Sequence, residues 1–194
     1  MFKGINILLV LTMILLFSLC SCSTEAGGDE QLNGRPDVET AYAKAEEAYS
    51  WFDLTTLNYD SADVKEYNGM HYAKVTHETI KCVDDLRNYL QTLFTDEITE
   101  TLLQEDQDTP LYRDFDGELY VIPAGRGADI TKGEAQGEVF DETENIIQYN
   151  VTVDIVDPSA DFAVTGSETY TFLYEYIEDD EGSKWAFTNF ESIR

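Results

Sequence analysis

Basic residues are scarce in this sequence. Only 12 Lys and Arg stand against 39 Asp and Glu in 194 residues, which gives a formal net charge of −27. Binding to nucleic acid depends on clustered Lys and Arg that neutralise phosphates, so the shortage excludes that class of partner. A charge this one-sided is typical of disorder where aromatic residues are also rare, but 12 Tyr, 10 Phe and 2 Trp can form a core. We therefore expect an acidic, folded protein.

Long apolar runs are also missing, apart from one near the N-terminus. Residues 7–17 form an apolar stretch interrupted only by Thr12 and preceded by the positive charge of Lys3. Because a membrane-spanning helix needs about 20 apolar residues, this stretch is typical of a signal peptide, which we place at residues 1–21.

The segment Leu19-Cys20-Ser21-Cys22 resembles a bacterial lipobox, whose cysteine receives diacylglycerol. Cys22 fits that position, and an ordinary secretory signal with an incidental cysteine is the alternative. Residues 22–36, rich in Gly and polar side chains, then predict a flexible tether, and residues 37–194 a single globular domain. The expected location is the extracytoplasmic face of a bacterial cell membrane, to which the lipid anchors a monomeric protein.

Residues that could carry catalysis or bind metal are few. After processing only Cys82 remains, at a helical spacing with Leu86 that predicts a small core residue. The two histidines, His71 and His77, would lie about 20 Å apart along a strand. The sequence has no H-E-x-x-H, C-x-x-C or G-x-S-x-G motif. We therefore expect neither an enzyme nor a metal or cofactor site.

Hydrophobic periodicity is helical in the first half and alternating in the second. The turn Asp116-Gly117 between two alternating runs is a strong signal for a hairpin. The order predicts an α+β fold, with N-terminal helices packed on a curved antiparallel β-sheet. We expect helices at residues 38–53, 79–93 and 96–103, an irregular polar segment at 58–69, and strands at 70–76, 112–115, 118–122, 138–140, 147–155, 168–177 and 184–190.

Two surface features are candidates for partner binding. Between residues 96 and 118 nine acids stand against Arg113 alone, which predicts either a solvated surface or a field that steers a basic partner. The other feature is the segment after the hairpin, where two glycines flank one long side chain. It predicts a recognition loop or a plain wide turn. Its candidate partner-binding residues are Gly125, Arg126, Gly127 and Asp129.

Several short motifs, in their order and spacing, resemble the IseA-type DL-endopeptidase inhibitors. The motifs include Tyr72-Ala73-Lys74-Val75, Asp116-Gly117-Glu118-Leu119-Tyr120 and Gly125-Arg126-Gly127, within a similarity that spans residues 67–190. The broader pattern is similar to cystatin-like and nuclear-transport-factor-two-like domains of secreted lipoproteins. The resemblance implies a non-catalytic protein that binds cell-wall hydrolases of the NlpC type and blocks their groove.

The resemblance also implies that a glycine-flanked loop enters the groove, and here this loop maps to Gly125, Arg126 and Gly127. An acid is expected at the loop centre, where this sequence has Arg126, with Asp129 further on. Two other functions stay open. One is an extracellular adaptor with an unrelated partner, and the other is a small-ligand domain with a pocket in the curved sheet. That pocket would be lined by Tyr170, Phe172, Tyr174 and Trp185.

Overall fold

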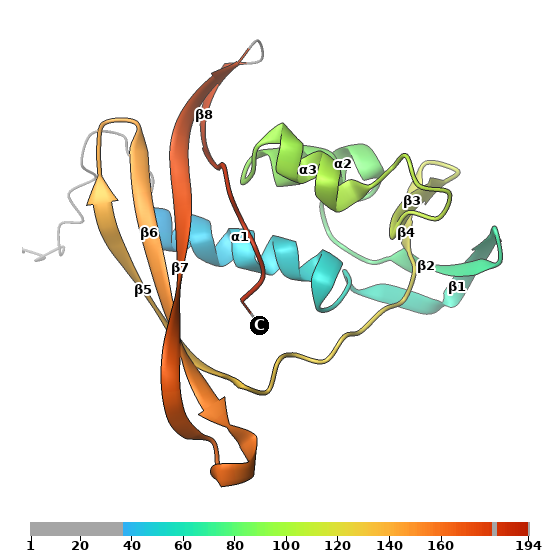
Figure 1. The fold of residues 1–194 in the computed structure, drawn as a ribbon. Coiled ribbons are helices and arrows are strands. Elements are labelled where there is room, and N and C mark those ends of the chain that lie inside the picture. The colour runs from blue at the N-terminus through green and yellow to red at the C-terminus, as the bar shows by residue number, and fades with distance from the viewer. Residues whose placement is uncertain (1–36, 180–181, 194) are drawn as a thin grey trace, which may run out of the picture. The chain divides into compact units, whose positions relative to one another are not determined.

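The computed structural model describes residues 37–179 and 182–193. The expected signal peptide, the lipidation site at Cys22 and the tether at residues 22–36 lie outside the described residues. Within these ranges the chain forms three α-helices and two antiparallel sheets of four strands each (Figure 1). The α+β class predicted from the periodicity is therefore confirmed, with a helix preceding the sheets.

The first helix, α1 (Val38–Asp53), has the predicted bounds. Asp37 starts it, because its carboxylate accepts the backbone N–H of Glu39 at 3.1 Å and the hydroxyl of Thr40 at 2.5 Å. One face of the helix is buried over its whole length, so it packs against other elements at both ends. The buried residues are Val38, Tyr42, Ala45, Ala48 and Trp51.

The first sheet has the strand order β1-β2-β4-β3. Its strands are β1 (Tyr59–Tyr67), β2 (Met70–Val75), β3 (Tyr112–Phe115) and β4 (Glu118–Val121). The expectation of an irregular segment at residues 58–69 is wrong, because β1 forms there. Asn68 and Gly69 join β1 to β2 with φ of 49° and 77°, the left-handed pair that a tight hairpin requires. The predicted turn at Asp116-Gly117 is confirmed, with φ of 55° and 81°.

Two short helices, α2 (Val83–Gln91) and α3 (Asp96–Leu103), lie between these strand pairs. The prediction for α3 is confirmed, whereas α2 begins four residues later than predicted. The reason is a turn in which the His77 ring nitrogen Nδ1 accepts the backbone N–H of Ile80 at 3.1 Å. The carboxylate of Asp114 in β3 then accepts the N–H of Val83 at 2.9 Å. It thereby provides a partner for a backbone N–H in the first turn of α2, which has none within the helix.

The second sheet has its strands in chain order, β5-β6-β7-β8. They are β5 (Lys132–Glu142), β6 (Ile146–Asp157), β7 (Ala163–Asp179) and β8 (Gly182–Phe187), with a 3-10 helix, η1 (Pro158–Ala160), between β6 and β7. At the edge of the sheet, Phe187 of β8 is bridged to Phe94, which follows α2. The expectation of one curved sheet is therefore corrected to two.

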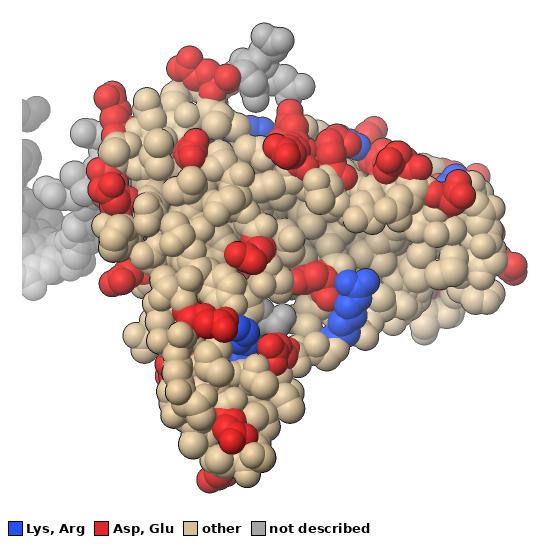
Figure 2. Space-filling view, viewed as in Figure 1, with Lys and Arg blue, Asp and Glu red and all other residues tan. Residues whose placement is uncertain are grey.

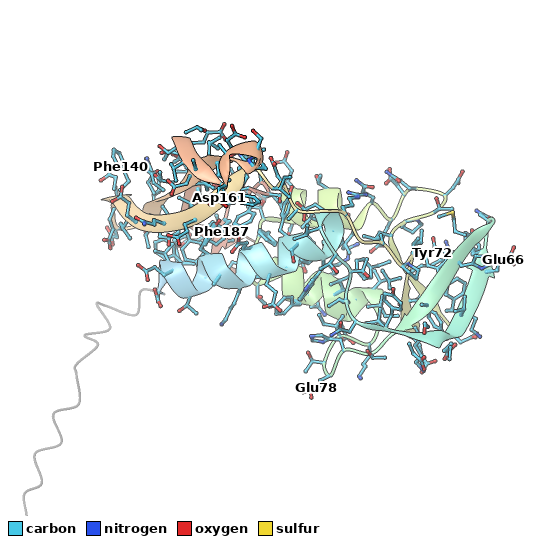
Figure 3. All side chains as sticks on the ribbon, turned by 90° about the horizontal axis from the view of Figure 1, so that it is seen from below. Glu66, Tyr72, Glu78, Phe140, Asp161 and Phe187 are labelled. Carbon is cyan, nitrogen blue, oxygen red and sulfur yellow. The ribbon has the colours of Figure 1, made fainter. Side chains whose placement is uncertain are left out.

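Both sheets pack on α1. Near its start, the ring of Tyr42 lies 5.2 Å from those of Tyr149 and Phe172 in the second sheet. Near its end, the ring of Phe52 lies 5.2 Å from that of Tyr112 in the first sheet. In Figure 3 the labelled Phe187 lies between the second sheet and α1, whereas Phe140 lies at the outer side of that sheet. Among the described residues, no helix is both long and apolar enough to cross a membrane.

Candidate binding site at the linker between the two sheets

A linker, residues 122–131, joins β4 of the first sheet to β5 of the second (Figure 1). Several backbone hydrogen bonds hold it in place. The N–H of Ile122 donates to Leu111 at 2.9 Å, that of Arg126 to Leu54 at 2.8 Å, and the Asp129 carbonyl accepts from Lys132 at 3.1 Å. Residues 123–131 are nevertheless exposed. The predicted recognition segment thus combines a fixed backbone with side chains open to solvent.

The two glycines of this linker provide no special backbone conformation. Neither Gly125 nor Gly127 has a positive φ. A Cβ atom at either position would also meet nothing within 4 Å. Small size and exposure are therefore what these residues contribute, rather than a conformation that only glycine can adopt.

Arg126 differs from most basic residues of the described part of the chain. Most of these residues are bound to a carboxylate, a carbonyl or an aromatic ring, as Arg87 is to Glu100 and Glu105. Within the described residues, the side chains of Arg126 and of Lys44 on α1 form no hydrogen bond or ion pair, and both residues are exposed. Arg126 is thus a cation available to a partner in a strongly acidic protein.

Asp129, the other charged candidate, has a local structural role. Its Oδ1 accepts the backbone N–H of Thr131 at 2.9 Å and the hydroxyl of Thr131 at 2.7 Å. These hydrogen bonds, first of all that from the backbone, hold the pKa of Asp129 below its usual value. Asp129 is therefore charged and fixed in position three residues after Arg126.

A pocket of about 390 Å³ lies beside the end of the linker. Ala128 and Asp129 form one side, the start of β5 with Lys132 and Glu134 forms another, and Val153 and Ile193 are also part of the lining. Val153 and Ile193 are buried, whereas the linker residues are exposed. The structure thus places one of the four predicted binding residues, Asp129, in a pocket.

Lys132 is fixed at this pocket by two residues of β7. Its Nζ donates to the carboxylate of Glu168 and, at 2.9 Å, to the hydroxyl of Tyr170, which donates to the same carboxylate at 2.8 Å. The bond with Glu168 is the main reason that the pKa of Lys132 is raised and that of Glu168 lowered. Sequence reasoning missed this group, because no local pattern links residues 36 and 38 positions apart.

Most of the acids between residues 96 and 118 already have a bonding partner within the protein. Of the nine acids, Asp114 caps α2 and five others lie within ion-pair distance of a Lys or Arg. Those five are Asp96, Glu100, Glu105, Asp116 and Glu118. Figure 2 shows that red carboxylates are nevertheless spread over the visible face and outnumber the blue cations. Negative charge is thus a property of the surface rather than of one patch.

The aromatic residues expected to line a pocket in the sheet belong mainly to the core. Phe172 and Tyr174 are buried, and their rings lie 4.9 Å from Phe190 and 4.7 Å from Phe187 respectively. The ring of Trp185 lies 5.5 Å from that of Tyr174. Tyr170 instead binds Lys132 through its hydroxyl. The structure therefore gives these four residues packing partners, and the 390 Å³ pocket lies elsewhere.

The remaining reactive side chains are separate from one another. Cys82 is a free, half-buried thiol at the start of α2, and His77 is engaged in the turn before it. His71 is exposed on β2. Across residues 37–179 and 182–193, no three His, Cys, Asp or Glu side chains are grouped so that they could hold a metal ion.

No protein-family model matches this chain, and a search of curated proteins finds no match either. The resemblance to IseA-type inhibitors therefore stays a prediction from the sequence.

Proposed function

We propose that this chain is a lipid-anchored extracytoplasmic binding protein that inhibits peptidoglycan DL-endopeptidases of the NlpC type, with the linker at residues 122–131 as the inhibitory element. The observation that supports it best is Arg126. Its side chain is exposed and unpaired among the described residues, while its backbone N–H is bonded to Leu54 at 2.8 Å. The protein acts by occupying a groove and performs no catalysis.

A fixed backbone favours this function on energetic grounds. Ordering a loop on binding costs conformational entropy, and a loop that is already held in place avoids much of that cost. The hydrogen bond from the Arg126 N–H to Leu54, the residue after α1, and that from the Thr131 N–H to Asp129 hold the linker before any partner arrives. Residues 123–131 can therefore enter a groove with little rearrangement.

The charge of the linker indicates what the partner must offer. The Arg126 guanidinium carries five N–H donors and no acceptor, so the groove must supply carboxylates or carbonyls to receive it. Around it, the general excess of acid attracts a basic rim. Such long-range attraction raises the association rate and weakens as salt is added.

Inhibition assays test this proposal directly. The purified full chain is mixed with a panel of NlpC-type hydrolases, and the release of peptide from cell-wall material is measured. We expect inhibition at low salt, and an inhibition constant raised by Arg126→Ala. Lys44→Ala is the matched control, since Lys44 is the other exposed and unpaired cation of the described chain.

Two further variants locate the inhibitory element. Asp129→Asn is expected to weaken inhibition more than Glu178→Gln, which lies at the far end of β7. Equal effects of these two changes would contradict the role of the linker. Absence of both binding and inhibition across the panel would contradict the proposed function itself.

A further inference from the structure

The pocket beside the linker combines opposite charges with an apolar floor. Asp129 and Glu134 contribute carboxylates, Lys132 contributes an ammonium group, and Val153 and Ile193 contribute buried aliphatic side chains. Its volume of about 390 Å³ lies at the small end of the roughly 300–1,000 Å³ that is usual for ligand pockets. That size suits an amino acid or a dipeptide.

Lys132 retains a donor for a ligand. An ammonium group has three N–H donors, and Glu168 and Tyr170 receive two of them. The side chain of Lys132 is only 15% exposed, so a hydrogen bond made there is shielded from water. A ligand carboxylate in the pocket could therefore accept the remaining N–H.

The two carboxylates of the pocket lining retain acceptors. Both hydrogen bonds from Thr131 to the Asp129 carboxylate go to Oδ1, so Oδ2 keeps its acceptor capacity. Glu134, exposed on β5, forms no ion pair within the described residues. A ligand ammonium group could therefore be bound by one or both of these side chains.

We infer that this pocket binds a zwitterionic ligand, such as an amino acid or a dipeptide, with Lys132 receiving its carboxylate and Asp129 with Glu134 receiving its ammonium group. A ligand with only a positive charge leaves the remaining N–H donor of Lys132 unused, and one with only a negative charge is repelled by the two acids. A molecule that carries both charges uses both sets of groups, and a small aliphatic side chain covers Val153 and Ile193. The pocket shares Ala128 and Asp129 with the linker, but ligand binding here does not require the proposed hydrolase inhibition.

Calorimetric titration of the full chain with the dipeptide Ala-Ala tests the inference, because no hydrolase is needed. Three blocked forms serve as comparisons: N-acetyl-Ala-Ala lacks the ammonium group, Ala-Ala amide lacks the carboxylate, and N-acetyl-Ala-Ala amide lacks both. Hydrogen bonds to charged groups are strong enough that each singly blocked form should bind about tenfold or more weakly than Ala-Ala. Equal affinity for all four peptides, or no binding of Ala-Ala, would overturn the inference.

Two variants assign the binding to this pocket. Lys132→Met should abolish the preference for Ala-Ala over its amide, because only the carboxylate of the ligand loses its partner. Ala128→Trp adds a large side chain at an exposed lining position and should abolish binding without entering the core. The control is Lys184→Met, which removes a lysine 3.9 Å from Asp96 and should leave affinity unchanged. Full affinity in Ala128→Trp, with an unchanged melting temperature, would place the ligand elsewhere and refute the assignment.

Discussion

The hydroxyl of Tyr112 donates to the backbone carbonyl of Trp51 at 3.0 Å, joining β3 to the last turn of α1. The same hydroxyl accepts the N–H of Leu57 at 2.9 Å, just before β1 begins. Carbonyl groups in the last turn of a helix have no partner within the helix, and a buried N–H without a partner is costly. One buried side chain therefore satisfies two backbone groups where α1 meets the first sheet.

Replacing Tyr112 by Phe tests the importance of this contact. The variant keeps the ring, which packs on Phe52, but leaves the Leu57 N–H without its acceptor. We expect the free energy of unfolding to fall by about 1–3 kcal/mol, as measured by urea denaturation. Tyr67→Phe is the control, because that ring contacts Arg113 through its face and should tolerate loss of the hydroxyl.

Burial of Tyr112 also predicts an alkaline transition. Burial raises the pKa of Tyr112 far above its ordinary value of 10.0, and the Leu57 N–H opposes the shift only in part. The folded state therefore retains this proton at pH values where the unfolded state releases it, so stability is full below pH 10 and declines above it. We expect the stability difference between the native chain and Tyr112→Phe to shrink as the pH rises above 10. A difference that stays constant in urea titrations on both sides of that pH would contradict this.

The sequence predicts α1, α3 and β2 closely but misses β1. Local spacing predicts both the apolar face of α1 and its cap at Asp37. β1 was missed because its residues are almost all exposed and show no apolar alternation, although Asn68-Gly69 is itself a strong hairpin signal. The division into two sheets could not be predicted either, because alternation identifies strands but not the pairs that they form.

The candidate site was predictable only in part. The linker stands out in the sequence because glycines surround Arg126 and follow a strand directly. Lys132, Glu168 and Tyr170 carry no such signal, because pairing of β5 with β6 and of β6 with β7 is what brings them together. Pairing between distant strands therefore brings the charged groups of the pocket together, and local sequence patterns do not predict it. The glycines of the linker are a local pattern, and they do predict an exposed segment.

A glycine in β5 is expected to be essential for packing. A Cβ atom on Gly137 would lie 1.8 Å from the hydroxyl and 2.4 Å from Cζ of Tyr149, whose ring is buried against Tyr42. Gly137→Ala should lower the free energy of unfolding by about 1–3 kcal/mol, the usual cost of overpacking. Gly166→Ala in β7 has open space and should be nearly neutral, so equal melting temperatures for the two variants would contradict the prediction.

The cap of α1 should contribute to stability in a pH-dependent way. Hydrogen bonds from Thr40 and from the backbone at Glu39 lower the pKa of Asp37 below its usual 3.8. The contribution is therefore present above pH 3.8 and is lost as the pH falls through the lower pKa of the folded state. We expect Asp37→Ala to cost about 1 kcal/mol at neutral pH and less in acid, as followed by circular dichroism during denaturation. Glu47→Ala, exposed on the same helix, should show neither effect.

Two exposed phenylalanines should respond to the same substitution in opposite directions. Phe162 follows η1 with a φ of 56° and is 57% exposed, whereas Phe140 lies in the β5 strand and is 65% exposed. A left-handed backbone costs an L-residue roughly 1–2 kcal/mol, and glycine avoids that cost. In a strand, glycine instead removes a side chain and adds freedom to the unfolded chain. Phe162→Gly should therefore raise the free energy of unfolding by a fraction of that cost, and Phe140→Gly should lower it by about 0.5–1 kcal/mol. Changes of the same sign in the free energy of unfolding of both variants, measured by urea denaturation, would show that the left-handed backbone at Phe162 does not destabilise the protein.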